Sequence, residues 1–182
     1  MNKIKLIIAV ILMVISFNGM AQEKYGNTLN LGLGLGYYGY GGVTFPVLHA
    51  NYEIDILKDF TLAPFLTYYS YSGGYSWGDN SHAWKNYSYH ETVVPFGLKG
   101  TYYFDDLIGA SPKWDFYLAG SLGILMTSHG SINDNVPTDD FYRQTGSLFF
   151  DLHIGTEYHI SSRIGVFLDL STGVSTIGIA IH

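Results

Sequence analysis

Three histidines and a glutamate are the first candidates for chemistry in this sequence, and three of these four residues are spaced four and two positions apart. The set comprises His49, His153, Glu157 and His159. Imidazole and carboxylate groups are common ligands of zinc. In an extended chain, however, four residues span about 13 Å, so His153 and Glu157 do not reach one ion without help from a neighbouring strand. We therefore predict no metal ligands and no cofactor, and interpret these histidines as hydrogen-bonding residues.

Ser88 and His90 are the second candidate, because a serine activated by a histidine can attack an acyl bond. Two residues apart on a strand, their side chains share one face. A catalytic histidine also needs an acid to orient it, and Glu91 points to the opposite face. The sequence therefore predicts no catalytic residues and a protein that is not an enzyme, with lipid hydrolysis as the alternative.

Residues 70–90 read SYSGGYSWGDNSHAWKNYSYH and interleave aromatic side chains with Gly, Ser, Asn and His. Binding loops that adapt to a partner have this composition. We predict surface contacts through Tyr75, Trp77, Trp84 and Tyr87. A second segment, 127–144, gathers aspartates without the spacing and glycine of an EF-hand, and we interpret it as a solvated acidic loop, with divalent cation binding as the alternative.

Alternation of apolar and polar residues predicts the elements that carry these candidates. Within residues 147–160, for example, Leu152 and Ile154 alternate with Asp151 and His153, which is the period of a strand. Eight segments show this alternation and predict an all-β fold, an eight-stranded antiparallel up-and-down β-barrel. The predicted strands cover residues 28–38, 46–56, 60–71, 87–104, 114–126, 147–160, 164–171 and 174–182.

Charged residues are scarce on these strands. Asp, Glu, Lys and Arg make up 13% of the chain, against about 25% in soluble domains, and Lys99 is the only Lys or Arg within the predicted strands. A cation at the middle of a bilayer costs about 2–4 kcal/mol, so we predict a transmembrane barrel whose apolar faces meet lipid. A soluble barrel is the alternative. The net charge of −6 argues against a nucleic-acid partner.

The opposite strand faces point into the barrel and carry polar groups. We predict a polar network in this lumen from His49, Glu53, Lys99, Asp151, His153, Glu157 and Asp169. Counting residues from the short turns places Lys99 among Glu53, Glu157 and Asp169, because a buried cation needs opposite charges. Eight strands enclose an interior that side chains can fill. We therefore expect a filled lumen, with a narrow conducting path as the alternative.

Connections of different length and clusters of aromatic residues mark the two ends of the barrel. Compact connections are predicted at 57–59, 105–113 and 161–163, and long loops at 72–86 and 127–144, which is typical of transmembrane barrels. Aromatic residues gather near both membrane interfaces. The predicted girdles are Tyr37, Tyr69, Tyr71, Tyr87 and Tyr89 toward the loops, and Phe60, Tyr102, Phe104, Trp114 and Tyr158 toward the turns.

Residues 1–21 have the pattern of a secretory signal peptide. Lys3 and Lys5 precede an apolar stretch at 6–17, and small residues lead to Ala21. The apolar stretch is shorter than the roughly 20 residues that a membrane-spanning helix needs. We therefore predict a signal peptide at 1–21 and an exported barrel domain at 22–182.

These features together resemble a known family. They are the signal peptide, the opening strand LNLGLGLGYYG, the eight alternating segments, and YYSYS before a Tyr- and Gly-rich segment. The combination is similar to the small outer-membrane β-barrel proteins of Gram-negative bacteria, the OmpX/OmpA type with an outer membrane protein beta-barrel domain. The signal ending MAQ resembles those of the Bacteroidota. Such barrels usually end in an aromatic residue, whereas this sequence ends IGIAIH at His182.

The resemblance implies a location and a set of partners. We expect the bacterial outer membrane with both termini periplasmic, contact with lipid and lipopolysaccharide, insertion by the barrel-insertion machinery, and a monomer. It also implies a structural, adhesion or surface-interaction role, in which the Tyr- and Trp-rich loops contact an extracellular ligand or a host surface. A narrow porin-like channel or small-molecule transporter and a lipid A-modifying acyl hydrolase are the alternatives.

Overall fold

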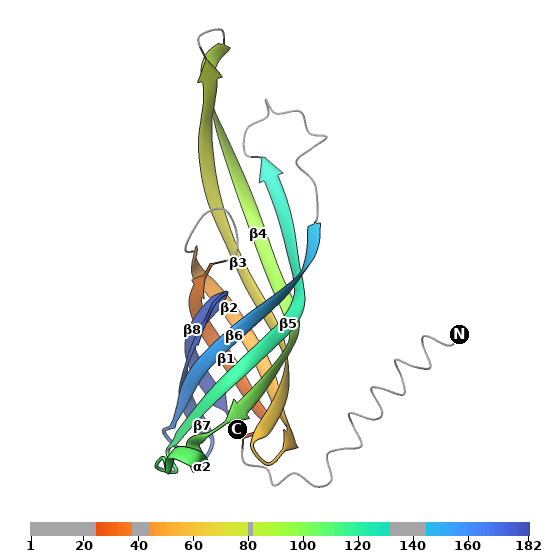
Figure 1. The fold of residues 1–182 in the computed structure, drawn as a ribbon. Helices are drawn as coiled ribbons and strands as arrows, with labels where there is room; N and C mark the ends of the chain where they lie inside the picture. Colours follow the sequence, from red (N-terminus) through yellow and green to blue (C-terminus); the bar gives the residue numbers. More distant parts are fainter. Residues whose placement is uncertain (1–24, 38–43, 80–81, 132–144) are drawn as a thin grey trace, which may run out of the picture.

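The protein forms one closed antiparallel β-barrel, in which each strand pairs with the next and β8 pairs with β1 (Figure 1). The computed structural model describes residues 25–37, 44–79, 82–131 and 145–182. The predicted signal peptide at 1–21 lies outside these residues. The prediction of an all-β, eight-stranded antiparallel up-and-down barrel is confirmed.

The strand bounds agree with the predicted segments at most ends. The strands are β1 (Thr28–Gly36), β2 (Thr44–Leu57), β3 (Phe60–Asp79), β4 (His82–Tyr103), β5 (Trp114–Ser131), β6 (Thr145–His159), β7 (Ile164–Ser171) and β8 (Val174–Ile181). A short helix, α2 (Asp105–Ile108), lies between β4 and β5. Within the described residues, no helix has the length and apolar character to cross a membrane.

The barrel has two distinct ends. At one end, which we call the turn end, lie the compact connections at 58–59, 104–113 and 160–163, together with the start of β1 and the end of β8 (Figure 1). At the opposite end, the loop end, β1 and β5 end, β2 and β6 begin, and residues 172–173 connect β7 to β8. The two chain ends of the barrel therefore lie on the same side as the compact turns.

Side chains alternate between the two faces of every strand because the strand period is two. In β1, Leu31 and Leu33 are 45% and 50% exposed, whereas Thr28 and Asn30 are 1% and 6% exposed. The same division holds around the barrel, with most leucine and isoleucine side chains outside and the carboxylates of the barrel strands inside. The predicted assignment of faces is therefore confirmed for these strands.

The β3–β4 hairpin differs from the prediction, because the segment 72–86 forms strand rather than a long loop. The pairing of β3 with β4 continues from Phe60↔Tyr102 to Asp79↔His82. The described pairing of β2 with β3 reaches Tyr68, and that of β4 with β5 reaches Tyr89. Residues 73–79 and 82–88 therefore form a two-stranded extension, the ribbon, which stands beyond the loop end (Figure 1).

The loop prediction failed there for a physical reason. A ladder between two strands depends on backbone hydrogen bonds and needs no apolar face, so a Gly-, Ser- and Tyr-rich segment can extend it. The predicted loop at 127–144 is likewise shortened, since β5 continues to Ser131. Residues 132–144 lie outside the described residues.

The aromatic girdle at the turn end is present. Phe60, Tyr102 and Trp114 are 37%, 39% and 40% exposed, and Phe104 is half-buried. The ring centroids of Trp114 and Tyr158 lie 4.8 Å apart. The prediction of aromatic residues around the turns is therefore confirmed.

The predicted girdle at the loop end is wrong for Tyr69 and Tyr71. Tyr69 is fully buried, and it packs inside the barrel against Val47, Val93 and Val174, with Tyr71 beside this group. Both tyrosines occupy inward positions of β3, so their nearness to the strand end does not bring them to the surface. Tyr37 is 41% exposed. The side chains of Tyr87 and Tyr89 lie outside the described residues.

A pair of inward-facing glycines lets two strands approach closely. Gly97 of β4 lies opposite Gly123 of β5. A Cβ on Gly97 would lie 2.2 Å from the carbonyl oxygen of Leu122, and a Cβ on Gly123 would lie 2.2 Å from that of Phe96. Because both obstacles are backbone atoms, the strands must separate to admit a side chain at either position.

We expect Gly97→Ala to lower the free energy of unfolding by about 1–3 kcal/mol, the range for overpacking a filled interior. Gly120→Ala is the matched control, because its Cβ would first meet the Phe150 ring at 3.6 Å. Urea unfolding in lipid vesicles, followed by tryptophan fluorescence, measures both. Equal losses for the two variants would contradict the close approach of β4 and β5.

Candidate functional site

An ion pair crosses the middle of the barrel. Lys99 projects inward from β4 and Asp169 from β7, and the two side chains form a salt bridge although their strands are not neighbours. Each residue is 3% exposed. Asp169 also accepts a hydrogen bond of 3.0 Å from the Tyr117 hydroxyl, and its second oxygen lies 2.7 Å from His153 Nδ1. We call Lys99, Tyr117, His153 and Asp169 the Asp169 cluster.

Glu53 lies nearer the turn end and is satisfied by neutral donors. Its carboxylate accepts hydrogen bonds from Asn30 at 2.9 Å, Thr61 at 2.6 Å and Tyr103 at 2.7 Å. Glu53 and Lys99 line one cavity of about 10 Å³ together with Glu157 and Asp169. Lys99 thus lies among the three carboxylates named from the sequence, but its salt bridge is with Asp169, while Glu157 binds His182.

His49 and Asp151 make further hydrogen bonds inside the barrel. Asn51 donates a hydrogen bond of 3.1 Å to His49 Nε2, and His49 Nδ1 lies 2.7 Å from the Thr67 hydroxyl. A neutral imidazole that accepts at one nitrogen donates at the other. Asp151 accepts hydrogen bonds from Ser171 at 2.8 Å and from Thr172. These contacts tie β2 to β3 and β6 to the β7–β8 turn.

Two cavities between side chains of the described lumen are small. Beside the cavity of about 10 Å³, a second cavity of about 20 Å³ lies between His49, Phe65, Phe149 and His153. A volume of roughly 10–15 Å³ holds one water molecule. The interior therefore has room for single waters between the side chains, as an eight-stranded barrel of this kind is expected to have.

The turn end of the lumen carries a second group of contacts, which we call the mouth cluster: Thr28, Asp115, Glu157, His159 and His182. His182 Nε2 lies 2.7 Å from Glu157 Oε1, and His159 Nε2 lies 2.6 Å from Asp115 Oδ2. The hydrogen bond to Glu157, together with nearby negative charge, raises the pKa of His182 against the opposing effect of burial.

Sequence reasoning missed His182 and Asp115 as members of this group. Period-two alternation places both on inward faces, so their orientation was available from the pattern. Their nearness to Glu157 and His159 was not, because it depends on how β5, β6 and β8 are staggered at the turn end. Predicting this stagger requires the register of three strand pairs.

Tyr25 covers the same end from the segment before β1. Its ring stacks on Tyr103 with the centroids 3.9 Å apart and the planes parallel. Its hydroxyl donates to Asp105, the first residue of α2, at 2.8 Å. The chain preceding β1 is thereby attached to the connection between β4 and β5.

The predicted contact residues Tyr75, Trp77, Trp84 and Tyr87 all belong to the ribbon. Tyr75 lies opposite Tyr87, and Trp77 opposite Lys85. The side chains of residues 73–89 lie outside the described residues, so the ribbon is described by its backbone. The four aromatic residues are thereby placed on one hairpin beyond the barrel.

The Ser88 and His90 candidate has a different partner from the one expected. His90 Nδ1 lies 3.0 Å from the hydroxyl of Ser72, its cross-strand neighbour on β3. The Ser88 side chain lies outside the described residues. This contact pairs an exposed serine with an exposed histidine and does not supply the acid that orients a catalytic histidine.

Comparisons with known proteins give matches to solved structures. No protein-family model matches the sequence, and no curated protein matches it. The structure is similar to the N-terminal β-barrel domain of OprF from Pseudomonas aeruginosa, at 13% identity and a TM-score of 0.46, with 86% of this chain and 96% of that chain covered. It is also similar to Ail, the attachment invasion locus protein of Yersinia pestis, at 8% identity and a TM-score of 0.42, with 86% and 98% covered. Similarity at this level carries no implication for ligands or partners.

We expect Lys99→Met to lower the free energy of unfolding by about 3–5 kcal/mol, because it leaves the Asp169 charge buried without its cation. Lys58→Met is the matched control. Lys58 Nζ lies 3.3 Å from Asp106, with 69% of its side chain exposed, and an exposed pair contributes about 1 kcal/mol or less. Urea unfolding in lipid vesicles measures both.

The double variant Lys99→Met/Asp169→Asn removes both charges and should recover at least about half of the loss, since a neutral pair avoids the unpaired buried charge. A single variant as stable as the wild type would show that the salt bridge does not support the interior.

Proposed function

We propose that the chain is an integral β-barrel protein of a bacterial outer membrane, and that it presents the ribbon outside the cell as a surface for interaction. The observation that carries the membrane assignment is the distribution of side chains, which is the reverse of that in a soluble protein. Aliphatic residues cover the outside of the barrel, and the described charged side chains of its strands lie inside.

The outer face supports this assignment quantitatively. Leu122 is 61% exposed, Leu148 80% and Ile177 57%, whereas Lys99, Asp151 and Asp169 are 2–3% exposed. Burying a leucine or isoleucine contributes about 1.5–3 kcal/mol, and a ring of such side chains left in water would be unfavourable. Lipid removes this penalty, because it is the solvent that such a surface matches.

The positions of the Lys and Arg residues also support lipid as the surroundings of the barrel wall. Lys58, Lys113 and Arg163 lie in the connections of the turn end, where they can reach headgroups or water. A soluble barrel would carry such residues on its outward strand faces. The membrane assignment also accounts for Phe60, Tyr102 and Trp114, since aromatic rings favour the interface between lipid and water.

The orientation in the membrane follows from the two ends. Outer-membrane barrels have short turns in the periplasm and longer segments outside. On this basis the turn end, with the start of β1 and the end of β8, faces the periplasm, and the ribbon faces outward. Both termini of the barrel are then periplasmic, and lipid, lipopolysaccharide and the barrel-insertion machinery are its partners. Membership of the Bacteroidota remains a prediction from the signal ending.

The interaction role is favoured over a channel and over an enzyme. The Lys99–Asp169 salt bridge spans the lumen, and the cavities between described side chains have room for about one water each. Among the described side chains, the hydrogen-bond partner of His90 is the Ser72 hydroxyl and not an acid. The ribbon, by contrast, carries Tyr75 and Trp77 about 20–26 Å along the strand direction beyond Tyr69, as the rise over six to eight strand residues implies.

Arginine at the middle of the outer face tests the membrane assignment. We expect Leu122→Arg to lower the free energy of unfolding in lipid vesicles by about 2–4 kcal/mol, the cost of a cation near the bilayer midplane. Leu107→Arg is the matched control, since Leu107 is 76% exposed but lies on α2, outside the strands. A barrel surrounded by water would tolerate both variants, and that result would refute the assignment.

Removal of the ribbon's aromatic residues tests the interaction role. A variant with Tyr75, Trp77, Trp84 and Tyr87 each changed to serine should bind an array of immobilised glycans and peptides at least about tenfold more weakly than the wild type. Truncating an aromatic hot spot costs about 2 kcal/mol or more.

The control for that experiment is the variant Ser76→Ala/Asn86→Ala, which alters one cross-strand pair of the ribbon and keeps its aromatic residues. Both variants should keep the gel mobility difference between boiled and unboiled samples that a folded barrel gives. Unchanged array binding by a folded variant lacking the four aromatic residues would contradict the interaction role.

A further inference from the structure

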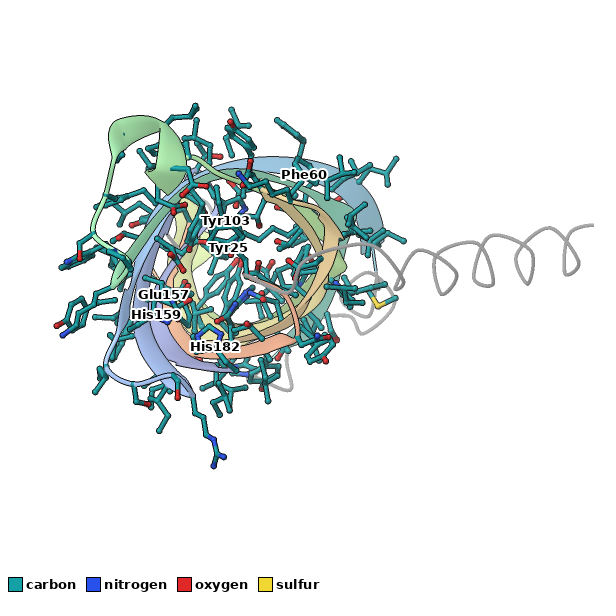
Figure 2. All side chains as sticks on the ribbon, turned by 90° about the horizontal axis from the view of Figure 1, so that it is seen from below. Tyr25, Phe60, Tyr103, Glu157, His159 and His182 are labelled. Atoms are coloured by element: carbon teal, nitrogen blue, oxygen red, sulfur yellow. The ribbon has the colours of Figure 1, made fainter. Side chains whose placement is uncertain are left out.

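Three side chains that commonly bind metal ions meet at the turn end of the lumen. Glu157 and His159 come from β6, and His182 follows β8. One ligand atom from each lies within 4.8 Å of the other two. Figure 2, which looks into the barrel from the turn end, shows the three residues gathered on one side of the opening.

The separations suit one small ion. Glu157 Oε1 lies 2.7 Å from His182 Nε2 and 3.8 Å from His159 Nδ1. The two imidazole centroids are 4.9 Å apart. Ligands on a tetrahedral zinc ion, with bonds of about 2.1 Å, lie about 3.4 Å apart. Small rotations of the side chains therefore bring the three atoms to the distances that zinc requires.

The remaining ring nitrogens already have partners that hold the imidazoles in place. His159 Nε2 lies 2.6 Å from Asp115 Oδ2, and His182 Nδ1 lies 2.9 Å from the Thr28 hydroxyl. Metal-bound histidines usually bind a carboxylate or another oxygen through the nitrogen that faces away from the metal, and these contacts orient the ring. Each histidine of the mouth cluster thus has one nitrogen fixed and the other directed toward Glu157.

Glu157 occupies a recess that depends on a glycine. A Cβ on Gly165 of β7 would lie 1.9 Å from Glu157 Oε1, so a side chain at this position would displace the Glu157 carboxylate from the recess. Glu157 is 6% exposed, while the side chains of His159 and His182 are 22% and 17% exposed. The carboxylate is held at the base of the recess, and an ion can approach from the side of the two rings.

We propose that Glu157, His159 and His182 bind one Zn²⁺ ion, with water at a fourth position. Two imidazoles and one carboxylate are a ligand set that zinc accepts, and three protein ligands leave one position open. The ion would join β6 to the residue after β8 across β7, near the seam where β8 meets β1. Magnesium and calcium prefer all-oxygen ligands, so the site selects zinc over both. This inference does not depend on the proposed membrane location.

Zinc titration of the untagged full chain, refolded in detergent and freed of metal with EDTA, tests the proposal. Calorimetry should give one Zn²⁺ per chain, with no competition from a large excess of Mg²⁺ or Ca²⁺. We expect His159→Ala, His182→Ala and Glu157→Gln each to weaken binding at least tenfold. His90→Ala is the matched control, because His90 is exposed on β4, outside the mouth cluster, and it should bind as the wild type does.

X-ray absorption of the zinc-loaded wild type should show a first shell of nitrogen and oxygen at about 2.0–2.1 Å, with scattering from two imidazoles. This measurement decides the question if the histidine variants fail to fold, as judged by their gel mobility without boiling. The proposal is overturned if the wild type binds no stoichiometric zinc, if the absorption spectrum lacks imidazole scattering, if folded His159→Ala or His182→Ala binds as the wild type does, or if His90→Ala loses binding.

Discussion

The pairing of β8 with β1 is the constraint on which the other features of this protein depend. It closes the sheet from Leu29↔Ile181 to Gly36↔Val174, so that neither of these strands keeps a free edge within the barrel. With eight strands, closure also sets an interior about as wide as two opposing side chains. The identity of the inward residues, and the way in which they satisfy one another, follows from that width.

Charges inside so narrow a space must find partners across it. Lys99 projects from β4 and Asp169 from β7. The two side chains meet because the lumen is narrow enough for them to reach each other across it. Glu53 is compensated by three neutral donors, and Glu157 by His182. The same closure turns the aliphatic faces outward, and the proposed membrane location would supply the apolar surroundings that an ordinary protein core otherwise provides.

The ribbon is the part of the molecule least bound by these constraints. Beyond Tyr68 and Tyr89 the described pairing of β3 and β4 is with each other, so its sequence is free of the requirement to alternate between lipid and lumen. Gly, Ser, Tyr and Trp fill it, and this composition suits recognition. Under the proposed function the molecule separates two tasks: the wall of the barrel would meet lipid, and the ribbon would contact other molecules.

Much of the fold could be predicted from the sequence, because the period of two in a strand is a local property. Adjacent side chains point to opposite faces wherever the chain is extended. The fold class, the eight strands, the apolar outer face and the inward position of Lys99, Asp169 and Glu157 all follow from that pattern. The prediction was wrong for Tyr69 and Tyr71 because the face that a strand side chain occupies depends on its alternation and not on its nearness to the strand end. Which inward residues touch was decided by the tertiary structure alone. Contacts such as those of Lys99 with Asp169 and His182 with Glu157 join strands that are not neighbours, and they depend on the tilt and stagger that closure of the whole barrel imposes.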